Sequence, residues 1–396
     1  MFVVEFIVGL IASVLMLLVF VFSAQIIFAV PGYKGKKRFD SGTIPGFAVI
    51  IPAHNEEAVV KGTINSVLPQ LRSEDFLLVV ADNCSDRTAQ VSRECGATVT
   101  ERKSDLHRGK GFALEAGVKY LEEMAIDAEF LIFIDADCLV SANSLAALVS
   151  KCVETGRPAQ ALYLMRTSSR ASVSQKIAEF AWIVKNHIRP LGMSRLGLPC
   201  QLMGSGMAFP FSSVRKVQLG TSHIVEDMML GVDLALQGHP PVFCPDALVE
   251  SYFPEEKKSI DTQRERWEHG HLGMIFSRSP GLLKQAVVKF DKDLLAIALD
   301  LLLPPLALLG TILVLFTTLL VVTATVYGFG IFPLYILIIT LFMFTASIAI
   351  AWYRFARHVV SPKELLWIPG YILLKIPVYL RYWLQRQSDW IRTNRK

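Results

Sequence analysis

The chain has 396 residues, of which 52% are hydrophobic, and its mean hydropathy is +0.42. This mean is too high for an ordinary soluble protein, yet the middle of the chain is mixed in composition, so we expect a soluble domain joined to membrane helices. The net charge is only +5, and much of the basic excess lies beside apolar segments, which argues against nucleic acid as a partner and for a membrane surface.

The first 30 residues predict a membrane-spanning helix. Residues 2–30 contain one acid, Glu5, and one other strongly polar residue, Gln25, and at about 1.5 Å per residue they can cross a hydrocarbon core of roughly 30 Å. A cleaved signal peptide is the alternative, but no basic segment precedes the apolar run and the run is too long. A basic cluster follows and predicts that this end of the helix is cytoplasmic: Lys34, Lys36, Lys37 and Arg38.

Polar side chains follow the first two predicted strands of the middle segment. The run FAVII, residues 47–51, ends in PAHNEE, and the run at residues 76–81 ends in DNCSD, residues 82–86. Capping of the next helix by Ser85 or Asp86 is the simpler interpretation, but a cap needs only one of these residues. In an open parallel sheet, such groups gather at the carboxyl ends of the strands, where nucleotides bind.

A third strand, residues 97–101, leads to the segment HRGKG, residues 107–111, and then to an apolar helix at residues 112–121. Glycines beside Arg108 and Lys110 at a helix start suit a phosphate or a base edge, because free N–H groups and the positive helix end point the same way. The spacing is not that of a P-loop, which argues against an ATPase.

The run FLIFIDADCLV, residues 130–140, predicts a buried strand that delivers two carboxylates at its end, Asp135 and Asp137. Oxygen ligands suit Mg²⁺ or Mn²⁺, whose remaining ligands are usually substrate phosphates. Capping of the next helix by these aspartates is the alternative.

Three later segments carry further candidate residues. Small residues at 204–206 precede an apolar strand and allow close backbone approach. Glu226 and Asp227 open a helix that extends to about Gln237, where acids are stabilising in any case. In QRERW, residues 263–267, the first, fourth and fifth residues share one helix face. A helix at residues 173–188 is expected to pack against the membrane-side surface, and the alternative is that it faces an acceptor.

The segments PAHNEE, DNCSD, HRGKG and DAD, in this order and spacing, resemble the nucleotide-binding half of family 2 inverting glycosyltransferases with the GT-A fold, over roughly residues 45–275. His54 stands where the family often has Tyr. The resemblance implies a nucleotide-sugar donor, expected to be a UDP-sugar, and a Mg²⁺ or Mn²⁺ ion held by Asp135 and Asp137. It implies these donor-binding residues: Glu56, Asp82, Asp86, Lys110, Asp135, Gln263 and Arg266.

The same resemblance assigns the chemistry. The Glu226-Asp227 pair would supply the catalytic base, Asp227, and Gly204 and Ser205 would line the acceptor sugar. QRERW matches the Q-x-x-R-W motif of membrane-integrated polysaccharide synthases, in which Arg266 would neutralise the leaving diphosphate and Trp267 would stack on the acceptor.

The last hundred residues predict two more spans. An apolar stretch at residues 294–326 is interrupted by Asp300 and by a proline pair, and a second covers residues 331–352. We expect an interfacial lead-in, two spans and a return to cytoplasmic Arg354 and Arg357. Residues 365–384 mix aromatic, basic and proline residues, which favours a helix in the membrane interface. A basic tail would meet anionic headgroups: Arg386, Arg392, Arg395 and Lys396.

The predicted fold class is α/β, a GT-A (nucleotide-diphospho-sugar transferase), Rossmann-like and mostly parallel sheet with transmembrane and interfacial helices. The predicted domains are a span (1–32), a cytoplasmic catalytic domain (33–290), two spans with their lead-in (291–353) and an interfacial helix with a basic tail (354–396).

The predicted function is a metal-dependent inverting hexosyltransferase of the bacterial plasma membrane that extends a surface polysaccharide, with a homo-oligomer or export proteins as further partners. The alternatives are single addition to a polyprenyl-diphosphate-linked oligosaccharide, and a non-catalytic scaffold or transporter.

Overall fold

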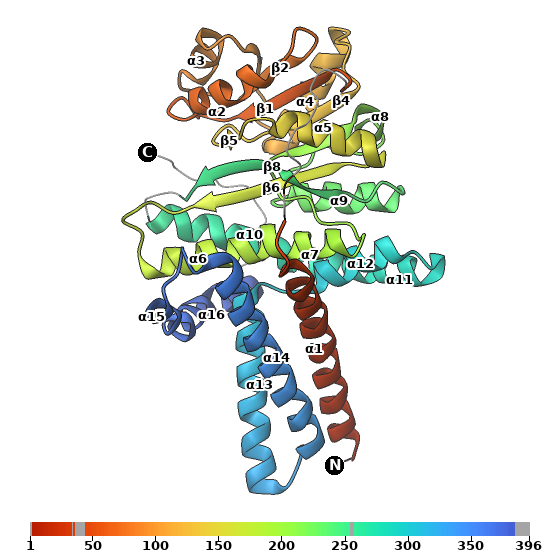
Figure 1. Cartoon of the computed structure of the whole chain (residues 1–396), viewed down its shortest axis with the longest axis vertical. Coiled ribbons are helices and arrows are strands. Elements are labelled where there is room, and N and C mark those ends of the chain that lie inside the picture. The colour runs from red at the N-terminus through yellow and green to blue at the C-terminus, as the bar shows by residue number, and fades with distance from the viewer. Residues whose placement is uncertain (1, 34, 36–43, 254–256, 385–396) are drawn as a thin grey trace. The chain divides into compact units, whose positions relative to one another are not determined.

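A computed structural model describes residues 2–33, 35, 44–253 and 257–384. The chain divides into two compact units (Figure 1). In the described chain the sheet unit comprises Tyr33–Ser168 and Leu198–Gly270, and the helical unit comprises the segments up to Gly32, Ser169–Gly197 and from His271 onward. Two predicted basic clusters lie outside the described residues: Lys34, Lys36, Lys37 and Arg38, and Arg386, Arg392, Arg395 and Lys396.

The sheet unit is built on an eight-stranded sheet with the strand order β3-β2-β1-β4-β7-β6-β8-β5. Its first half is parallel: β1 (Phe47–Ala53) lies between β2 (Phe76–Asp82) and β4 (Phe130–Phe133), and β3 (Thr98–Arg102) borders β2. β1, β2 and β4 are apolar and almost wholly buried, which is typical of parallel strands covered by helices on both faces. Their carboxyl ends therefore meet at one end of the sheet.

The second half of the sheet is mixed. β7 (Met207–Pro210) is antiparallel to both β4 and β6 (Ala159–Arg166). β6 is parallel to β8 (Val242–Tyr252), and the short β5 (Leu139–Val140) is antiparallel to β8. The loop that precedes β7 therefore arrives beside the carboxyl end of β4.

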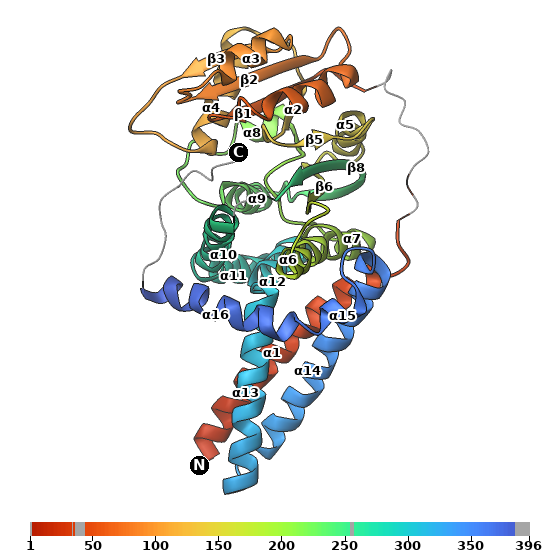
Figure 2. The same cartoon turned by 90° about the vertical axis from the view of Figure 1, so that its left-hand side faces the viewer.

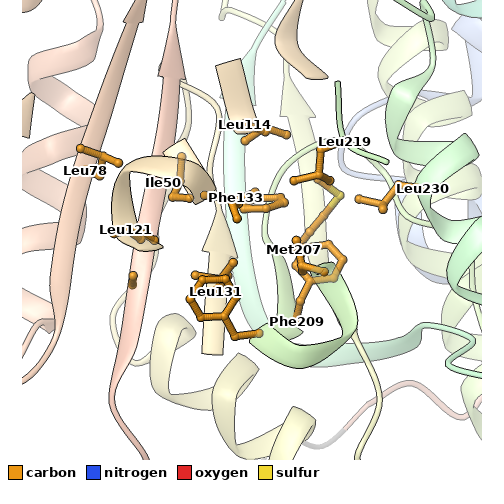
Figure 3. Close-up of a cluster of buried hydrophobic side chains, with 14 of the residues drawn as sticks. Ile50, Leu78, Leu114, Leu121, Leu131, Phe133, Met207, Phe209, Leu219 and Leu230 are labelled. Carbon is orange, nitrogen blue, oxygen red and sulfur yellow. The ribbon is translucent and has the colours of Figure 1, made fainter. Parts of the chain in front are cut away.

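Helices cover the sheet and complete a shared core (Figure 3). Ile50, Leu78 and Phe133 from the strands pack in one cluster with Leu114 of α4. A Cβ atom at Gly117 of α4 would lie only 2.8 Å from Ile50 Cγ2, so the absence of a side chain lets α4 approach the sheet closely. The helices of this unit are α2 (Val60–Val67), η1 (Leu68–Gln70), α3 (Thr88–Glu94), α4 (Lys110–Glu123), α5 (Ser144–Thr155), α8 (Phe211–Val214), α9 (Glu226–Leu236) and the first part of α10 (Lys257–Ser277).

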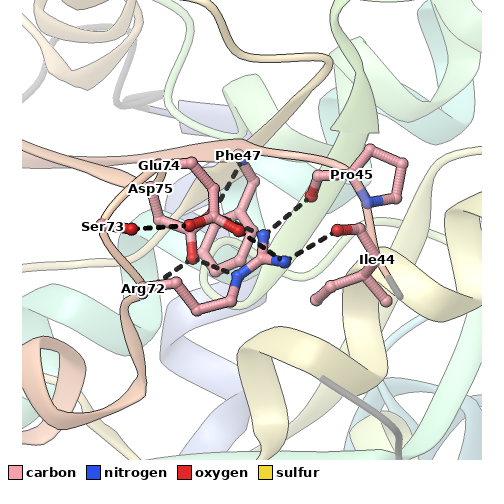
Figure 4. Close-up of polar contacts among 7 residues, drawn as sticks. All are labelled: Ile44, Pro45, Phe47, Arg72, Ser73, Glu74 and Asp75. Carbon is pink, nitrogen blue, oxygen red and sulfur yellow. Dashed lines mark hydrogen bonds and ion pairs between the residues drawn. The ribbon is translucent and has the colours of Figure 1, made fainter. Parts of the chain in front are cut away.

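Arg72 fixes the point at which β1 begins (Figure 4). Its guanidinium donates to the carbonyl oxygens of Ile44 (2.8 Å) and Pro45 (3.2 Å) and pairs with Asp75 at 2.8 Å. Asp75 also accepts a hydrogen bond from the N–H of Phe47 at 3.2 Å. These bonds satisfy backbone groups that would otherwise end without partners, and they tie the start of β1 to the turn before β2.

The helical unit contains three described helices that are long and apolar enough to cross a membrane, Val3–Ala29, Leu306–Tyr327 and Ile331–Ala356. Within this unit α1, α13 and α14 lie side by side, and α16 lies across them (Figure 2). The helices of the unit are α1 (Phe2–Ala29), α6 (Val173–Ile183), η2 (Val184–Ile188), α7 (Arg189–Arg195), the end of α10, α11 (Ser279–Lys289), α12 (Lys292–Leu302), α13 (Leu306–Tyr327), α14 (Ile331–Ala351), η3 (Trp352–Ala356), α15 (Pro362–Leu365) and α16 (Ile368–Leu384).

A buried polar cluster joins three helices of this unit. Gln25 of α1 donates to Asp300 Oδ1 of α12 at 2.7 Å, and Arg189 of α7 donates to both Gln25 Oε1 (2.9 Å) and Asp300 Oδ1 (2.7 Å). Each charged or amide group thus has a partner, which a buried ion pair needs if it is not to be destabilising. A Cβ atom at Gly192 would lie 1.9 Å from Gln25 O, so this glycine is what allows α7 and α1 to touch.

Three sequence expectations can be placed on this architecture. Residues 169–197, which the sequence assigned to the catalytic domain, group with the helical unit. The expected lead-in is a discrete helix, α12, which ends at Leu302 just before Pro304. The expected interfacial helix is α16, with Pro377 inside it. That α12 and α16 lie in a membrane interface stays a prediction.

Candidate functional site

The loops after β1 and β2 are locked together at the carboxyl end of the sheet. Asn55, with φ +55°, accepts hydrogen bonds through its Oδ1 from the N–H groups of Ser85 (2.7 Å) and Asp86 (3.3 Å). Asn is one of the few residues other than Gly that adopt this left-handed conformation readily. The N–H of Glu56 donates to Thr88 Oγ1 at 2.7 Å. The backbone of Glu56 is therefore fixed where the two loops meet.

Asp82 and Asp86 have different surroundings within this pair of loops. Asp82 is buried and pairs with Arg102 Nη1 at 2.5 Å, while His54 Nδ1 lies 2.6 Å from its carbonyl oxygen. Asp86 accepts from the N–H and the hydroxyl of Thr88, at 3.0 and 2.6 Å. Asp86 therefore accepts from Thr88 at the start of α3, although the N-cap position itself is Arg87 and has no side-chain cap, whereas Asp82 forms an ion pair with Arg102.

Arg102 is a site residue that the sequence analysis missed. It ends β3 and lies opposite Asp82 in the register of β2 and β3. Its Nη2 also donates to His107 O at 2.8 Å, and its guanidinium lies 5.7 Å from the ring centre of Phe112. The sequence offered one signal, a basic residue at the end of β3. That signal indicates a partner for Asp82 only when β3 is known to lie beside β2.

The turn after β4 is held from two sides. Ser205 Oγ accepts from the N–H of Asp135 at 3.0 Å, and Thr63 Oγ1 donates to Ala136 O at 2.7 Å. The candidate ligand atoms of Asp135, Asp137 and Cys138 all lie within 4.8 Å of one another. Burial, reinforced by Asp135, raises the pKa of Cys138 to about 12. Its thiol is therefore held protonated, and the two carboxylates are the better metal ligands.

These two carboxylates fit a hard divalent cation. They are partly exposed, so a bound cation could complete its shell with oxygen atoms of a ligand. The ammonium group of Lys110 already sits where positive charge is favoured: it contacts Asp135, lies 3.7 Å from Glu226 Oε1 and donates to Gly204 O at 2.7 Å. Burial would lower the pKa of Lys110, but the attraction of Asp135 and Glu226 outweighs it and raises the pKa.

Glu226 and Asp227 form the first turn of α9 and face the same cluster. Burial is the largest cause that raises the pKa of Glu226, to about 7, with Asp227 adding to the rise and Lys110 opposing it. A Cβ atom built on Gly204, whose φ is +93°, would lie 3.5 Å from Asp227 Oδ2, 3.9 Å from Asp135 Oδ2 and 4.0 Å from Lys110 Nζ. Gly204 thus lies in contact with three of the charged groups, in a backbone conformation that favours glycine.

A fully buried amide, Gln160 of β6, holds the loop that carries Gly204. Gln160 Oε1 accepts from the N–H of Met203 at 2.8 Å, and its Nε2 donates to Ser205 O at 2.9 Å. Sequence analysis missed this residue, because a single glutamine in an apolar strand 43 residues away gives no signal of a partner.

The predicted Q-x-x-R-W residues lie on α10. Gln263 is buried, and Arg266 and Trp267 are partly buried. Burial lowers the pKa of Arg266, while the carboxylates of Glu226 and Asp135 act in the opposite direction. A Cβ atom at Gly270 would lie 2.6 Å from Val225 Cγ1, which shows how closely α10 packs beside the start of α9.

The sheet and the acidic site at its end were compared with known protein families. Residues 45–270 match the sequence model of glycosyltransferase like family 2. That match covers more than half of the chain, so the chain belongs to this family, as its motifs predicted.

Two curated relatives and one solved structure extend the comparison. A poly-β-1,6-N-acetyl-D-glucosamine synthase of Staphylococcus epidermidis is 25% identical over 232 residues, which are 57% of this chain and 55% of the relative. A 4,4'-diaponeurosporenoate glycosyltransferase of Staphylococcus haemolyticus is 33% identical over 119 residues, 28% of this chain and 30% of the relative. The chain therefore spans about half the length of the first of these relatives, and less of the second.

A mannosyltransferase of Pyrobaculum calidifontis, solved with GDP-Man and Mn²⁺, has a TM-score of 0.57 at 15% identity, covering 96% of this chain and all of that one. This likeness shows the fold, and the GT-A prediction is confirmed. The chain combines that fold with three candidate membrane helices among its described residues.

Proposed function

We propose that the chain transfers a sugar from a nucleotide-sugar donor to an acceptor hydroxyl, with inversion at the anomeric carbon. The observation that carries the proposal is the convergence of charged groups on Gly204, where a Cβ atom would lie 3.5 Å from Asp227 Oδ2, 3.9 Å from Asp135 Oδ2 and 4.0 Å from Lys110 Nζ. With Glu226 beside Lys110, three carboxyl groups and one ammonium suit a reaction in which a proton leaves one oxygen while negative charge develops on another.

The residues divide between the two ends of this displacement. The acceptor oxygen attacks the anomeric carbon, its proton passes to an Asp227 carboxylate oxygen, and the bond from that carbon to the diphosphate oxygen breaks. Lys110 and Arg266 face the departing diphosphate and stabilise its charge. A divalent cation on Asp135 and Asp137 would add Lewis-acid stabilisation there. A single in-line step of this kind inverts the anomeric configuration.

The donor's base is expected to meet Asp82, Arg102 and the loop at Glu56. The UDP-sugar expectation came from the resemblance to family 2, while the solved neighbour was determined with GDP-Man, so a test must include both nucleotides. Glu56 and the ion pair of Asp82 with Arg102 offer acceptors and donors to the edge of a base.

The acceptor is proposed to be a growing glycan in surface polysaccharide synthesis, which the similarity to poly-β-1,6-N-acetyl-D-glucosamine synthase supports. Single addition to a lipid-linked acceptor is the second candidate. It is favoured because the described residues contain only three candidate spans, few for a channel formed by one chain. We further propose a cytoplasmic orientation of the sheet unit in the plasma membrane, because nucleotide sugars are made in the cytoplasm.

The test is transfer by the purified full-length chain in nanodiscs, using a panel of labelled UDP- and GDP-sugars with Mn²⁺ and both glycan and lipid-linked acceptors. Label should enter product from one donor, and sizing of the product separates a polymer from a single addition. Hydrolysis without transfer, or no reaction with any donor and acceptor, would count against the proposed function.

A further inference from the structure

Helices α11 and α12 of the helical unit form a hairpin (Figure 1). Its turn carries exposed apolar side chains. Leu282 and Ala286 are buried on one side of α11, whereas Val287 and Val288 are 65% and 69% exposed, and Phe290 in the turn is 95% exposed. Three exposed lysines surround them. We call the following group the hairpin tip: Lys284, Val287, Val288, Lys289, Phe290 and Lys292.

The backbone at the centre of the hairpin tip is unusual. Phe290 has φ +51° and ψ +38° and ends α11 in the left-handed conformation, which Gly or Asn adopts at most helix ends. An aromatic residue there is unfavourable in water on two counts, because its backbone is strained and its ring is exposed. A surface that covered the ring would offset both costs.

The charges of the hairpin tip suit an anionic surface. The side chains of Lys284, Lys289 and Lys292 are exposed, while the nearby Asp291 is engaged within the turn, where its Oδ1 accepts from the N–H groups of Asp293 (2.9 Å) and Leu294 (3.0 Å). An apolar centre rimmed by lysines is the composition of segments that lie in the headgroup region of a bilayer.

The position of α12 within the helical unit gives the depth at which the hairpin is expected to meet the bilayer. Asp300, near the end of α12, is hydrogen-bonded to Gln25, four residues before α1 ends at Ala29, which is about 6 Å along the helix axis. α11 and α12 run across the direction of α13 (Figure 1). The hairpin therefore leaves the bundle at the level where interfacial helices bury their apolar faces, roughly 5–10 Å deep.

From these observations we infer that the hairpin tip inserts into the headgroup region of an anionic bilayer, with Phe290 as its deepest side chain. The inference rests on the proposed membrane-spanning role of α1, α13 and α14. The inferred contact with lipid lies outside the spans and outside the catalytic residues. The strength with which the helical unit binds the membrane would then depend on the content of anionic lipid.

The experiment places a tryptophan at the hairpin tip of the full-length chain. Phe290→Trp and the control Leu106→Trp, a leucine of the sheet unit that is 90% exposed, are reconstituted in nanodiscs with neutral lipid or with added phosphatidylglycerol. Quenching by doxyl-labelled lipids and by aqueous acrylamide is measured, and the wild-type signal of the six native tryptophans is subtracted. Lys284, Lys289 and Lys292 are then changed to Gln together in the Phe290→Trp background.

We expect doxyl quenching of Phe290→Trp to exceed that of Leu106→Trp by at least about twofold, to increase with phosphatidylglycerol and to lose that increase in the triple lysine variant. Equal quenching of the two variants, with Phe290→Trp open to acrylamide, would overturn the inference. So would shielding from both quenchers, because another copy of the chain would then cover the patch.

Alkaline carbonate extraction of wild-type membranes tests the spans separately. A chain that resists extraction while position 290 stays in water contradicts the lipid contact alone. A chain that is extracted contradicts the spans and the lipid contact together, without bearing on sugar transfer.

Discussion

Glu226 and Asp227 are adjacent in the first turn of α9, yet their surroundings differ. Glu226 is only partly exposed and lies 3.7 Å from Lys110 Nζ, and burial raises its pKa to about 7, so its protonated form is favoured more than that of an exposed carboxyl group. Asp227 instead has its Oδ2 3.5 Å from where a Cβ atom of Gly204 would lie, so it borders the loop that is proposed to line the acceptor. The geometry therefore favours Asp227 as the base and Glu226 as a group that sets the charge around Lys110.

Asp227→Asn should leave donor binding nearly unchanged and lower sugar transfer by about 100-fold or more, because the amide keeps the shape but cannot take the proton. Calorimetry with the nucleoside diphosphate and a radiolabel transfer assay measure the two effects. Asp233→Asn, later in the same helix, is the matched control and should transfer normally. Transfer near the wild-type rate in Asp227→Asn would mean that another residue is the base.

Arg266→Ala should weaken nucleotide binding by about tenfold and also slow transfer, since a charge that faces the diphosphate acts in both the ground state and the transition state. Arg266→Lys should restore only part of the loss, because a point charge cannot reproduce a planar pair of donors. Titration calorimetry with wild-type protein and Arg93→Ala, an exposed surface arginine, provides the comparison. Unchanged affinity in Arg266→Ala would remove this residue from the donor site.

At the scale of elements, the loop before β7 is held in place by Gln160 of β6, a strand that contributes no charged group to the site. Gln160→Leu removes both hydrogen bonds that Gln160 makes to this loop and leaves the buried N–H of Met203 and carbonyl of Ser205 without them, which should cost about 2 kcal/mol or more. Thermal unfolding measures this cost. Gln90→Leu, an exposed glutamine on α3, should change stability by less than about 0.5 kcal/mol.

Gln160→Leu should also raise the Mn²⁺ concentration needed for half-maximal transfer, because Ser205 then no longer fixes the N–H of Asp135 and the two carboxylates lose their alignment. A loss of stability with an unchanged Mn²⁺ requirement would show that Gln160 supports only the fold.

The parallel half of the sheet could be predicted from sequence because β1, β2 and β4 are short apolar runs, and a polar group after each run marks where the strand ends. The residues that pair with those polar groups could not be predicted from the sequence. Arg102 meets Asp82 through the register of two strands, and Gln160 meets Met203 through the insertion of β7 between β4 and β6. Both contacts depend on long-range pairing, which no local pattern encodes.

At the scale of the whole molecule, hydropathy identified all three candidate spans, because continuous apolar runs of this length are rare outside membrane-spanning helices. It did not predict that residues 169–197 group with the spans, since helical periodicity indicates a buried face without indicating what covers it. Arg189 bonds this segment to α1 and α12, and Gly192 lets it approach α1 closely; neither residue has an apolar side chain that a periodic pattern would reveal.

The proposed orientation of the chain rests on the basic residues beside the candidate spans and can be tested at two exposed positions, Val153 and Tyr327. Val153→Cys in the sheet unit should react with an impermeant maleimide only after the cells are permeabilised, whereas Tyr327→Cys, at the end of α13, should react in intact cells. Wild-type cells give the background from the native thiols. Labelling in the reverse order would place the sheet unit outside and separate it from cytoplasmic nucleotide sugars.

Central to the proposed reaction is a divalent cation, which Asp135 and Asp137 would hold and which would stabilise the negative charge of the departing diphosphate. The most direct measurement is the initial rate of sugar transfer by the purified chain, first in excess EDTA and then after addition of Mn²⁺ or Mg²⁺. We predict no transfer in EDTA, recovery with either ion, and no recovery in Asp137→Asn at the same ion concentration. Full turnover in the chelator would contradict this role of the two carboxylates.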